Sequence, residues 1–399
     1  VFSFLPGMPT IPFIMIGVTL GVTSFIKNKK KASEATVIED EISSPEKGEE
    51  VVEQYLQVDP IEIEIGYGLI SLVDESQGGN LFNKISTTRK FIALEFGVLI
   101  PPVRVRDNLQ LSPNEYIIKI KGNIASTFEI HPDRFLAMNP GEIEDKIDGI
   151  PTKDPAFGLQ SYWVTREEKD RAELLGFTVV DAISVLSTHL QETLKENFDK
   201  ILSRQAVKQL LENLKKDYPA VIEDISADVL PLGTIQKVLQ NLLKELIPIK
   251  DLVQIIEALI DYSKVTKNID VLTEYVRHSL NNTIANLFKD GNGIIHAAAI
   301  SEKLEAYITA SFQNQKDAVQ TLGLNPVMLS DLKNKMQLIV NKFDSLGYKP
   351  IFITSATIRP YFYRLINSSF PTVAVLSYTE LPSQIEIEFI DNLELTNAY

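Results

Sequence analysis

The first 26 residues carry no charged side chain, and four lysines follow within the next five positions. A helix rises about 1.5 Å per residue, so residues 10–26 would cover roughly 25 Å of a hydrocarbon core about 30 Å thick. The lysine-rich flank at 27–31 favours the cytoplasmic side of a membrane. We therefore expect residues 1–26 to be the last transmembrane helix of a longer protein, with everything after Lys31 in the cytoplasm. A buried core helix is the alternative.

The composition beyond this segment excludes several classes of function. A net charge of −14 argues against nucleic acid as a partner, because phosphates require a basic surface. The chain has no cysteine, which excludes disulfides, thiolate metal sites and cysteine nucleophiles. Roughly 340 residues beyond the linker are too many for one hydrophobic core, so we expect two to four subdomains.

Residues 27–58 read as a charged linker, because acidic side chains crowd the part that follows the lysines. Such a segment repels itself and is expected to be extended or marginally helical. Its end carries an apolar stripe that could dock on a neighbour, consisting of Val51, Val52, Tyr55 and Leu56.

Mixed helix and strand patterns follow the linker. Isoleucine alternates with glutamate over 61–65, which predicts a half-buried strand, and the pattern predicts a second strand segment over 69–73. A helix is expected over 80–96, with further strands over 103–105 and 116–120. We predict a first α/β subdomain from 59–132 plus 182–201, interrupted by a small inserted subdomain at 133–181.

The period becomes helical from Ser184, and apolar stripes recur every three or four residues up to residue 281. This predicts a helical subdomain over 202–281. After the turn at 290–293 the pattern returns to α/β and predicts a C-terminal subdomain over 282–399. Residues 294–300 form an apolar run. The expected strands are 350–353, 372–376 and 385–389, and the expected helices are 302–312, 329–346 and 358–366.

No motif for catalysis or metal binding accompanies these elements. The four histidines show no metal-ligand spacing, and neither a phosphate-binding loop nor an HExxH motif occurs. His189 follows Ser187-Thr188 on an apolar helix face, where a structural histidine is favoured over a nucleophile–base pair. Arg104 and Arg106 could bind an anion, but local ion pairs are favoured. We therefore expect no catalytic residue, no metal and no cofactor.

Two glycine-containing segments remain open to two interpretations each. In Asp154-Pro155-Ala156-Phe157-Gly158 the aromatic ring could plug a small core. Alternatively, it could line a shallow apolar dimple, rimmed by Asp154, that captures an amphipathic helix. Gly66 and Gly68 could form a hinge between strand segments or a tight turn.

Several motifs together resemble one family across nearly the whole chain. They occupy residues 5–9, 66–69, 101–108, 154–158, 178–181, 188–190, 238–243, 272–277 and 375–381. In this order they are similar to the FlhA (FHIPEP) family, the export-gate proteins of the flagellar type III secretion apparatus, and their injectisome counterparts.

The resemblance implies a bacterial inner-membrane protein whose cytoplasmic part has four subdomains, the first of them thioredoxin-like. It implies a homo-nonameric ring that docks export chaperone–substrate complexes and passes unfolded substrates to a proton-driven gate. Other export-gate membrane proteins and the export ATPase complex would be partners, without nucleic acid or cofactor. Chaperone docking would use Asp154, Phe157 and Thr188, and Val51, Val52, Tyr55 and Leu56 would contact the next subunit.

Three other functions stay open from the sequence. An injectisome export gate would share most of these motifs and differ in its substrates. A passive ring scaffold would assemble without chaperone affinity. A membrane-anchored enzyme with an unrecognised site would show saturable turnover.

Overall fold

The computed structural model describes residues 58–394, apart from 75, 77, 142, 144, 145, 227 and 314–325. Val58–Tyr399 is one compact unit. The expected transmembrane helix at 1–26, the linker up to residue 57 and the stripe of Val51, Val52, Tyr55 and Leu56 lie outside the described residues. No helix in the described part of the chain is both long and apolar enough to cross a membrane.

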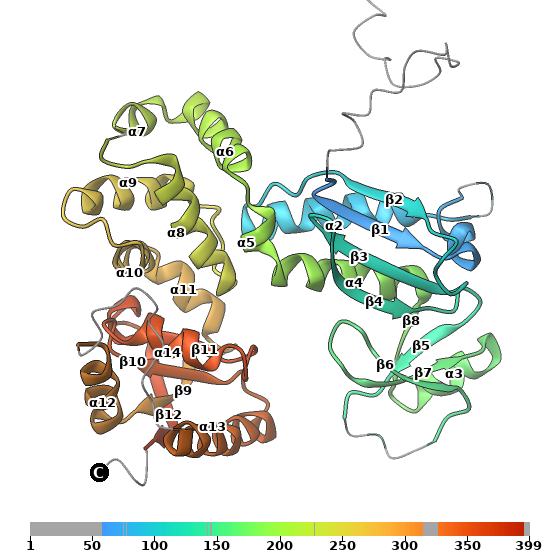
Figure 1. Cartoon of the computed structure of the whole chain (residues 1–399). Coiled ribbons are helices and arrows are strands. Elements are labelled where there is room, and N and C mark those ends of the chain that lie inside the picture. Colours follow the sequence, from blue (N-terminus) through green and yellow to red (C-terminus); the bar gives the residue numbers. More distant parts are fainter. Residues whose placement is uncertain are drawn as a thin grey trace, which may run out of the picture. The chain divides into compact units, whose positions relative to one another are not determined.

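The first sheet has the order β2-β1-β3-β4. Its elements are β1 (Ile61–Ile65), β2 (Val103–Asp107), β3 (Glu115–Ile120), β4 (Asn123–Glu129), α2 (Leu81–Phe96) and α4 (Ala182–Glu196). β1 pairs parallel with β2 and antiparallel with β3, and β3 pairs antiparallel with β4. Both helices lie behind this sheet in Figure 1. The isoleucines of β1 are buried, as their alternation predicts.

The predicted strand over 69–73 is wrong: Tyr67–Leu72 forms the 3-10 helix η3. β1 ends at Ile65: the N–H group of Gly66 still bonds to Glu115 O of β3, whereas that of Gly68 bonds to Pro113 O in the turn before β3, each at 2.8 Å. Leu69 and Leu72 are the buried residues of η3, and their spacing of three matches the 3-10 period. The expected break at the glycines is therefore present, but a turn of helix follows it.

The second sheet has the order β6-β7-β5-β8. Its elements are β5 (Phe135–Met138), β6 (Ile150–Lys153), β7 (Gln160–Val164), α3 (Arg166–Leu174) and β8 (Thr178–Asp181). All of its strand pairs are antiparallel. A small core of its own packs beneath it, formed by Ala137, Ile147, Val164, Ala172 and Phe177.

Helices follow one another from α5 to α11, as the apolar stripes predict. They are α5 (Phe198–Ile201), α6 (Arg204–Asp217), α7 (Pro219–Glu223), α8 (Leu232–Lys244), α9 (Leu252–Ser263), α10 (Ile269–Ser279) and α11 (Asn281–Phe288). The apolar stripes of α8, α9 and α10 are buried. Side-chain caps begin α9 and α10, where Asp251 and Asn268 accept bonds from N–H groups of the first turn.

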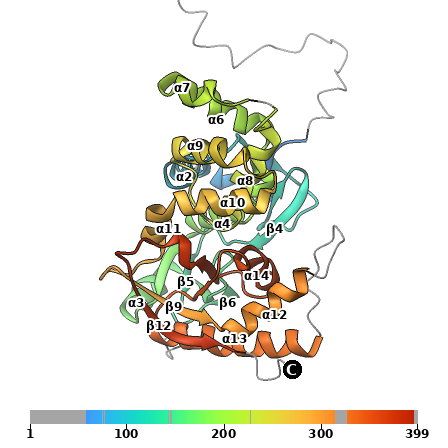
Figure 2. The same ribbon diagram turned by 90° about the vertical axis from the view of Figure 1, so that its left-hand side faces the viewer.

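The third sheet has the order β11-β10-β9-β12 and is parallel throughout. Its elements are β9 (Ile294–Ile300), α12 (Glu302–Gln313), α13 (Pro326–Leu346), β10 (Ile351–Thr354), α14 (Arg359–Ile366), β11 (Ala374–Ser377), the 3-10 helix η5 (Tyr378–Glu380) and β12 (Glu386–Leu393). The six predicted elements of this region are confirmed within a few residues, and the apolar run at 294–300 forms β9. β12 forms one edge and runs beside α13 (Figure 2).

A mixed α/β fold is thus confirmed. The division into four subdomains at the predicted boundaries stays a prediction.

Candidate functional site

The connection between β6 and β7 is a closed and well-bonded loop. Asp154 N donates to Leu159 O at 2.8 Å, and Gly158 N donates to Asp154 O at 2.9 Å. The Asp154 carboxylate folds back over the loop, and its Oδ2 accepts from Ala156 N at 3.1 Å and from Phe157 N at 2.6 Å. Gly158 has φ +71°, a left-handed conformation that favours glycine. Five consecutive residues therefore hold one defined shape.

This loop presents Phe157 to solvent. The phenylalanine is 59% exposed, so the interpretation of its ring as a plug of the small core is wrong. Ile150 of β6 and Leu159 are also exposed, at 41% and 36%. An exposed aromatic ring on a fixed loop offers apolar area without ordering cost, as a docking surface requires.

Asp154 behaves differently, since only 5% of it is exposed. Burial raises the pKa of its carboxyl above the ordinary value, and the bonds from Phe157 N and Ala156 N oppose that rise. Its Oδ2 is thus directed at its own loop.

Thr188 is half-buried on α4, beside a buried polar pair. His189 Nδ1 lies 2.6 Å from the Tyr116 hydroxyl, and both residues are buried. Burial raises the pKa of Tyr116 well above its usual value, and the Asp154 carboxylate raises it further. His189 is confirmed as a structural histidine, and Tyr116 is its partner, which sequence reasoning missed.

Gly66 and Gly68 pack closely against the turn at 112–114. A Cβ on Gly66 would lie 2.1 Å from Ser112 O, and one on Gly68 would lie 2.8 Å from Pro113 O. Real side chains do not approach backbone this closely, so glycine is required at both positions. Whether they also act as a hinge stays a prediction.

Arg104 and Arg106 form the local ion pairs that the sequence favours. Arg104 bonds Asp59 at 3.3 Å, and Arg106 bonds Asp59 at 2.9 Å and Glu62 at 3.0 Å. The alternative of an anion site loses its support, because the two arginines are paired with two carboxylates.

A buried cluster of charged side chains joins helices α8, α10 and α14 to η5. Arg277 donates to Glu380 at 2.6 and 2.9 Å, and Arg359 donates to Glu274 at 2.7 and 2.5 Å. Glu245 accepts from both arginines, at 2.9 and 2.6 Å. Both arginines are 1% exposed. Sequence reasoning missed this cluster, although Arg277 and Glu380 stand in two of the quoted motifs.

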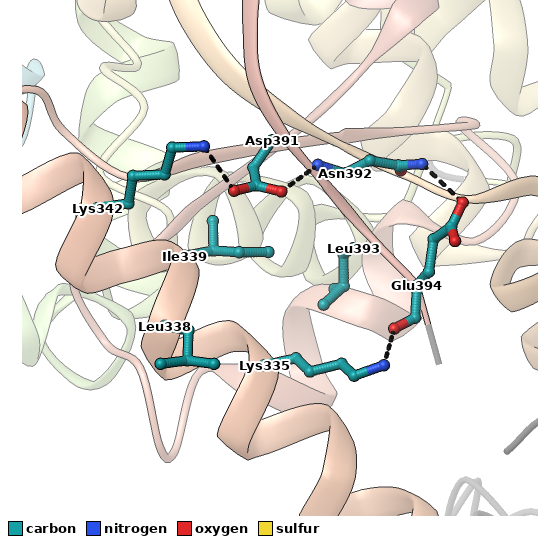
Figure 3. Close-up of a pocket in the computed structure, with 8 residues that line it drawn as sticks. All are labelled: Lys335, Leu338, Ile339, Lys342, Asp391, Asn392, Leu393 and Glu394. Atoms are coloured by element: carbon teal, nitrogen blue, oxygen red, sulfur yellow. Dashed lines mark hydrogen bonds and ion pairs between the residues drawn. The ribbon is translucent and has the colours of Figure 1, made fainter. Parts of the chain in front are cut away.

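A pocket of about 570 Å³ lies between α13 and β12 (Figure 3). Its two lysines are directed at the strand: Lys335 Nζ bonds Glu394 O at 2.5 Å, and Lys342 Nζ bonds Ile390 O and Asp391 Oδ2, each at 2.8 Å. None of the predicted site residues lines this pocket. Its lysines hold the edge strand to the helix.

Solved structures share this combination of three sheets and a helical segment. Chlamydia pneumoniae CdsV, also solved in complex with CdsO, matches with a TM-score of 0.74 over 86% of this chain and 98% of its own, at 24% identity. The nonameric EscV cytosolic domain from the type III secretion system matches with a TM-score of 0.68 over 85% of this chain and 97% of its own, at 19% identity. The fold is that of cytoplasmic domains from type III export proteins.

The chain belongs to the FHIPEP family, which its sequence matches over residues 1–386. The flagellar biosynthesis protein FlhA of Bacillus subtilis is 40% identical over 356 residues, which cover 89% of this chain and 52% of that protein. The chain spans about half the length of the curated relatives that it matches.

Proposed function

We propose that this chain is part of a flagellar type III export gate, whose cytoplasmic part docks chaperone–substrate complexes. Membership of the FHIPEP family supports the class of function. The single observation that supports docking is the 59% exposure of Phe157 on a loop closed by four hydrogen bonds. Such a surface suits an amphipathic helix.

In this proposal Phe157 supplies the apolar contact, and Asp154 and Thr188 complete the docking site. Burying a leucine-sized side chain against Phe157 would contribute roughly 2 kcal/mol. Isolated binding should therefore be modest, and copies of the site around a ring would raise it through avidity. No catalytic step is assigned to the chain.

The larger arrangement belongs to the same proposal. Residues 1–26 would span the bacterial inner membrane, 27–58 would link to the cytoplasmic part, and nine copies would form a ring through contacts that include Val51, Val52, Tyr55 and Leu56. The first subdomain would be thioredoxin-like and comprise residues 59–132 and 182–201, and residues 133–181 would form a small subdomain inserted into it. A helical subdomain would follow over 202–281, and a C-terminal α/β subdomain over 282–399. Gly66 and Gly68 would permit movement between open and closed forms. Other export-gate membrane proteins and the export ATPase complex would be its partners.

The test is calorimetric titration of the purified 399-residue chain with a flagellin–chaperone complex from the same organism. We expect saturable binding that Phe157→Ala weakens by about tenfold or more, since that loss corresponds to about 1.4 kcal/mol. Leu174→Ala is the matched control, because Leu174 is 89% exposed and lies on α3, outside the loop.

Equal weakening by both variants would contradict the placement of the site at Phe157. Binding of an effector–chaperone complex instead would favour an injectisome gate. Failure of the wild-type chain to bind either complex would favour a passive scaffold.

A further inference from the structure

The first half of the edge strand β12 lies beside a buried histidine of the neighbouring strand. Glu388 of β12 is the register partner of His296 on β9. His296 exposes only 6% of its surface, whereas the side chain of Glu388 is 64% exposed. A buried ring that can gain or lose a proton therefore contacts a carboxylate that can also turn towards solvent.

Asp290 determines which nitrogen of the His296 ring carries a hydrogen in the neutral state. Its Oδ1 accepts from Ile294 N at 2.9 Å, and its Oδ2 lies 3.2 Å from His296 Nε2. The bond from Ile294 N lowers the pKa of the Asp290 carboxyl, burial opposes this, and the contact with His296 lowers the pKa further. An ionised carboxylate only accepts, so we assign the hydrogen to Nε2 and a lone pair to Nδ1.

The other ring nitrogen, His296 Nδ1, is the atom that contacts the edge strand. It lies 3.0 Å from Glu388 Oε2, and it is buried without a hydrogen-bond partner among the residues that the structure describes. In the neutral ring a lone pair meets a carboxylate oxygen, and the two repel. A proton on Nδ1 makes the ring a cation and turns this repulsion into attraction. Tyr348 stacks on the ring at a centroid distance of 3.7 Å, and its π face also favours the cation.

Two further charged side chains lie near this histidine along the chain. Glu386 is exposed and precedes Glu388 by two residues, so strand alternation places both on one face of β12. Lys349 follows Tyr348, and its Nζ lies over the Phe288 ring, 4.6 Å from the centroid. Glu386 is therefore the charge on the same strand against which the effect of Glu388 can be compared.

The second half of β12 is held by contacts that involve no histidine. The register with β9 shifts between Phe389 and Asp391. From there Lys342 of α13 bonds Ile390 O and Asp391 Oδ2, each at 2.8 Å. Each half of the strand therefore has its own side-chain attachment to the neighbouring elements.

From this geometry we propose that His296 and Glu388 form a proton-dependent latch, which attaches the first half of β12 to β9. Histidine is the side chain that changes charge between pH 5 and pH 8, so the latch is closed at the acidic end of this range. As the pH rises and the ring loses its Nδ1 proton, the attraction is lost and residues 386–389 are held by backbone pairing alone. Residues 391–393 keep their attachment through Lys342.

Amide hydrogen exchange of the 399-residue chain at pH 8 and pH 6 tests this latch. Each rate is divided by that of the unstructured peptide at the same pH, which gives a protection factor. We expect protected amides of 386–389 to gain about fivefold in protection at pH 6, the upper end for a partly exposed ion pair, and those of 391–393 to gain none. The second half of the strand is thus an internal control for any change in global stability.

Glu388→Gln and Glu386→Gln are the matched variants, since both replace an exposed carboxylate on the same strand. We expect Glu388→Gln to abolish the gain in protection and Glu386→Gln to keep it. NMR of the ring nitrogens gives a second measurement that does not depend on the strand. We expect Nδ1 of His296 to gain the proton as the pH falls, while Nε2 stays protonated throughout.

An equal gain in both halves of β12 would overturn the proposal, because the effect would then be global. A gain that persists in Glu388→Gln, or that disappears equally in Glu386→Gln, would also overturn it, since the specific pair with His296 would not be responsible. So would NMR spectra in which Nδ1 keeps one protonation state from pH 8 to pH 6.

Discussion

The imidazole of His189 and the hydroxyl of Tyr116 illustrate how burial determines chemistry at the scale of a residue. The two groups are 2.6 Å apart in the core, and burial lowers the pKa of His189 to about 4. The ordinary value is about 6.5, so the unfolded chain binds this proton more readily than the folded chain. The stability contributed by the neutral imidazole is present above pH 6.5 and is lost as the pH falls towards 4.

We therefore expect the free energy of unfolding to fall by about 2 kcal/mol between pH 7 and pH 5 through His189. Urea denaturation at both pH values measures this, with His189→Gln as the comparison that should show a smaller decrease. Asp154, whose pKa burial raises, acts in the opposite direction at lower pH. A His189 ring that titrates near pH 6.5 in NMR spectra would contradict the prediction.

At position 66 glycine is required because the backbone of the turn at 112–114 lies too close for a side chain. We expect Gly66→Ala to destabilise the fold by about 3 kcal/mol or more, because its Cβ would collide with Ser112 O. Gly291→Ala is the matched control, since nothing lies within 4 Å there, and should change stability by less than about 1 kcal/mol. Chemical denaturation of both variants distinguishes them. Similar stability in the two variants would show that the turn at 112–114 shifts without cost.

At the scale of secondary structure, most helices and strands could be predicted from the periodic spacing of apolar residues. The stripes of α8 and α10 predict amphipathic helices, and the alternation over 61–65 predicts β1, because burial of one face requires those periods. The error over 69–73 arose where two periods compete. A short apolar run does not distinguish a strand from a 3-10 helix, and the decision came from hydrogen bonds to the Pro113 turn.

The buried charge cluster connects α8, α10 and α14 to η5, and we expect its disruption to lower the free energy of unfolding strongly. Arg277→Met should destabilise by about 3–5 kcal/mol, because it leaves Glu380 and Glu245 buried without this partner. Arg364→Met is the control on α14, where an exposed pair with Asp270 should contribute less than about 1 kcal/mol. Thermal or urea unfolding compares them. Equal losses of stability in the two variants would indicate that burial does not make the ion pairs of Arg277 more important than the exposed pair of Arg364.

Assembly is the question at the scale of the whole molecule. Under the proposed function we expect the 399-residue chain to form nine-copy assemblies, which native mass spectrometry in detergent would detect. Phe157→Ala should assemble as the wild type does while docking is weakened, because its ring is exposed on a loop. Loss of assembly in this variant would move Phe157 from the docking surface to a subunit interface. Monomers alone in the wild type would contradict the ring.

The sequence by itself determined the mixed α/β class, most elements of the C-terminal sheet and the family motifs, because local period and composition suffice for these. The resemblance to the family predicted Asp154, Phe157 and Thr188 as one docking site, which stays a prediction. Only the tertiary structure decided that Phe157 is exposed while Asp154 is buried, that Tyr116 pairs with His189 of α4, and that two arginines share Glu245. Each of these depends on contacts between residues far apart in the chain, and no local pattern encodes such contacts.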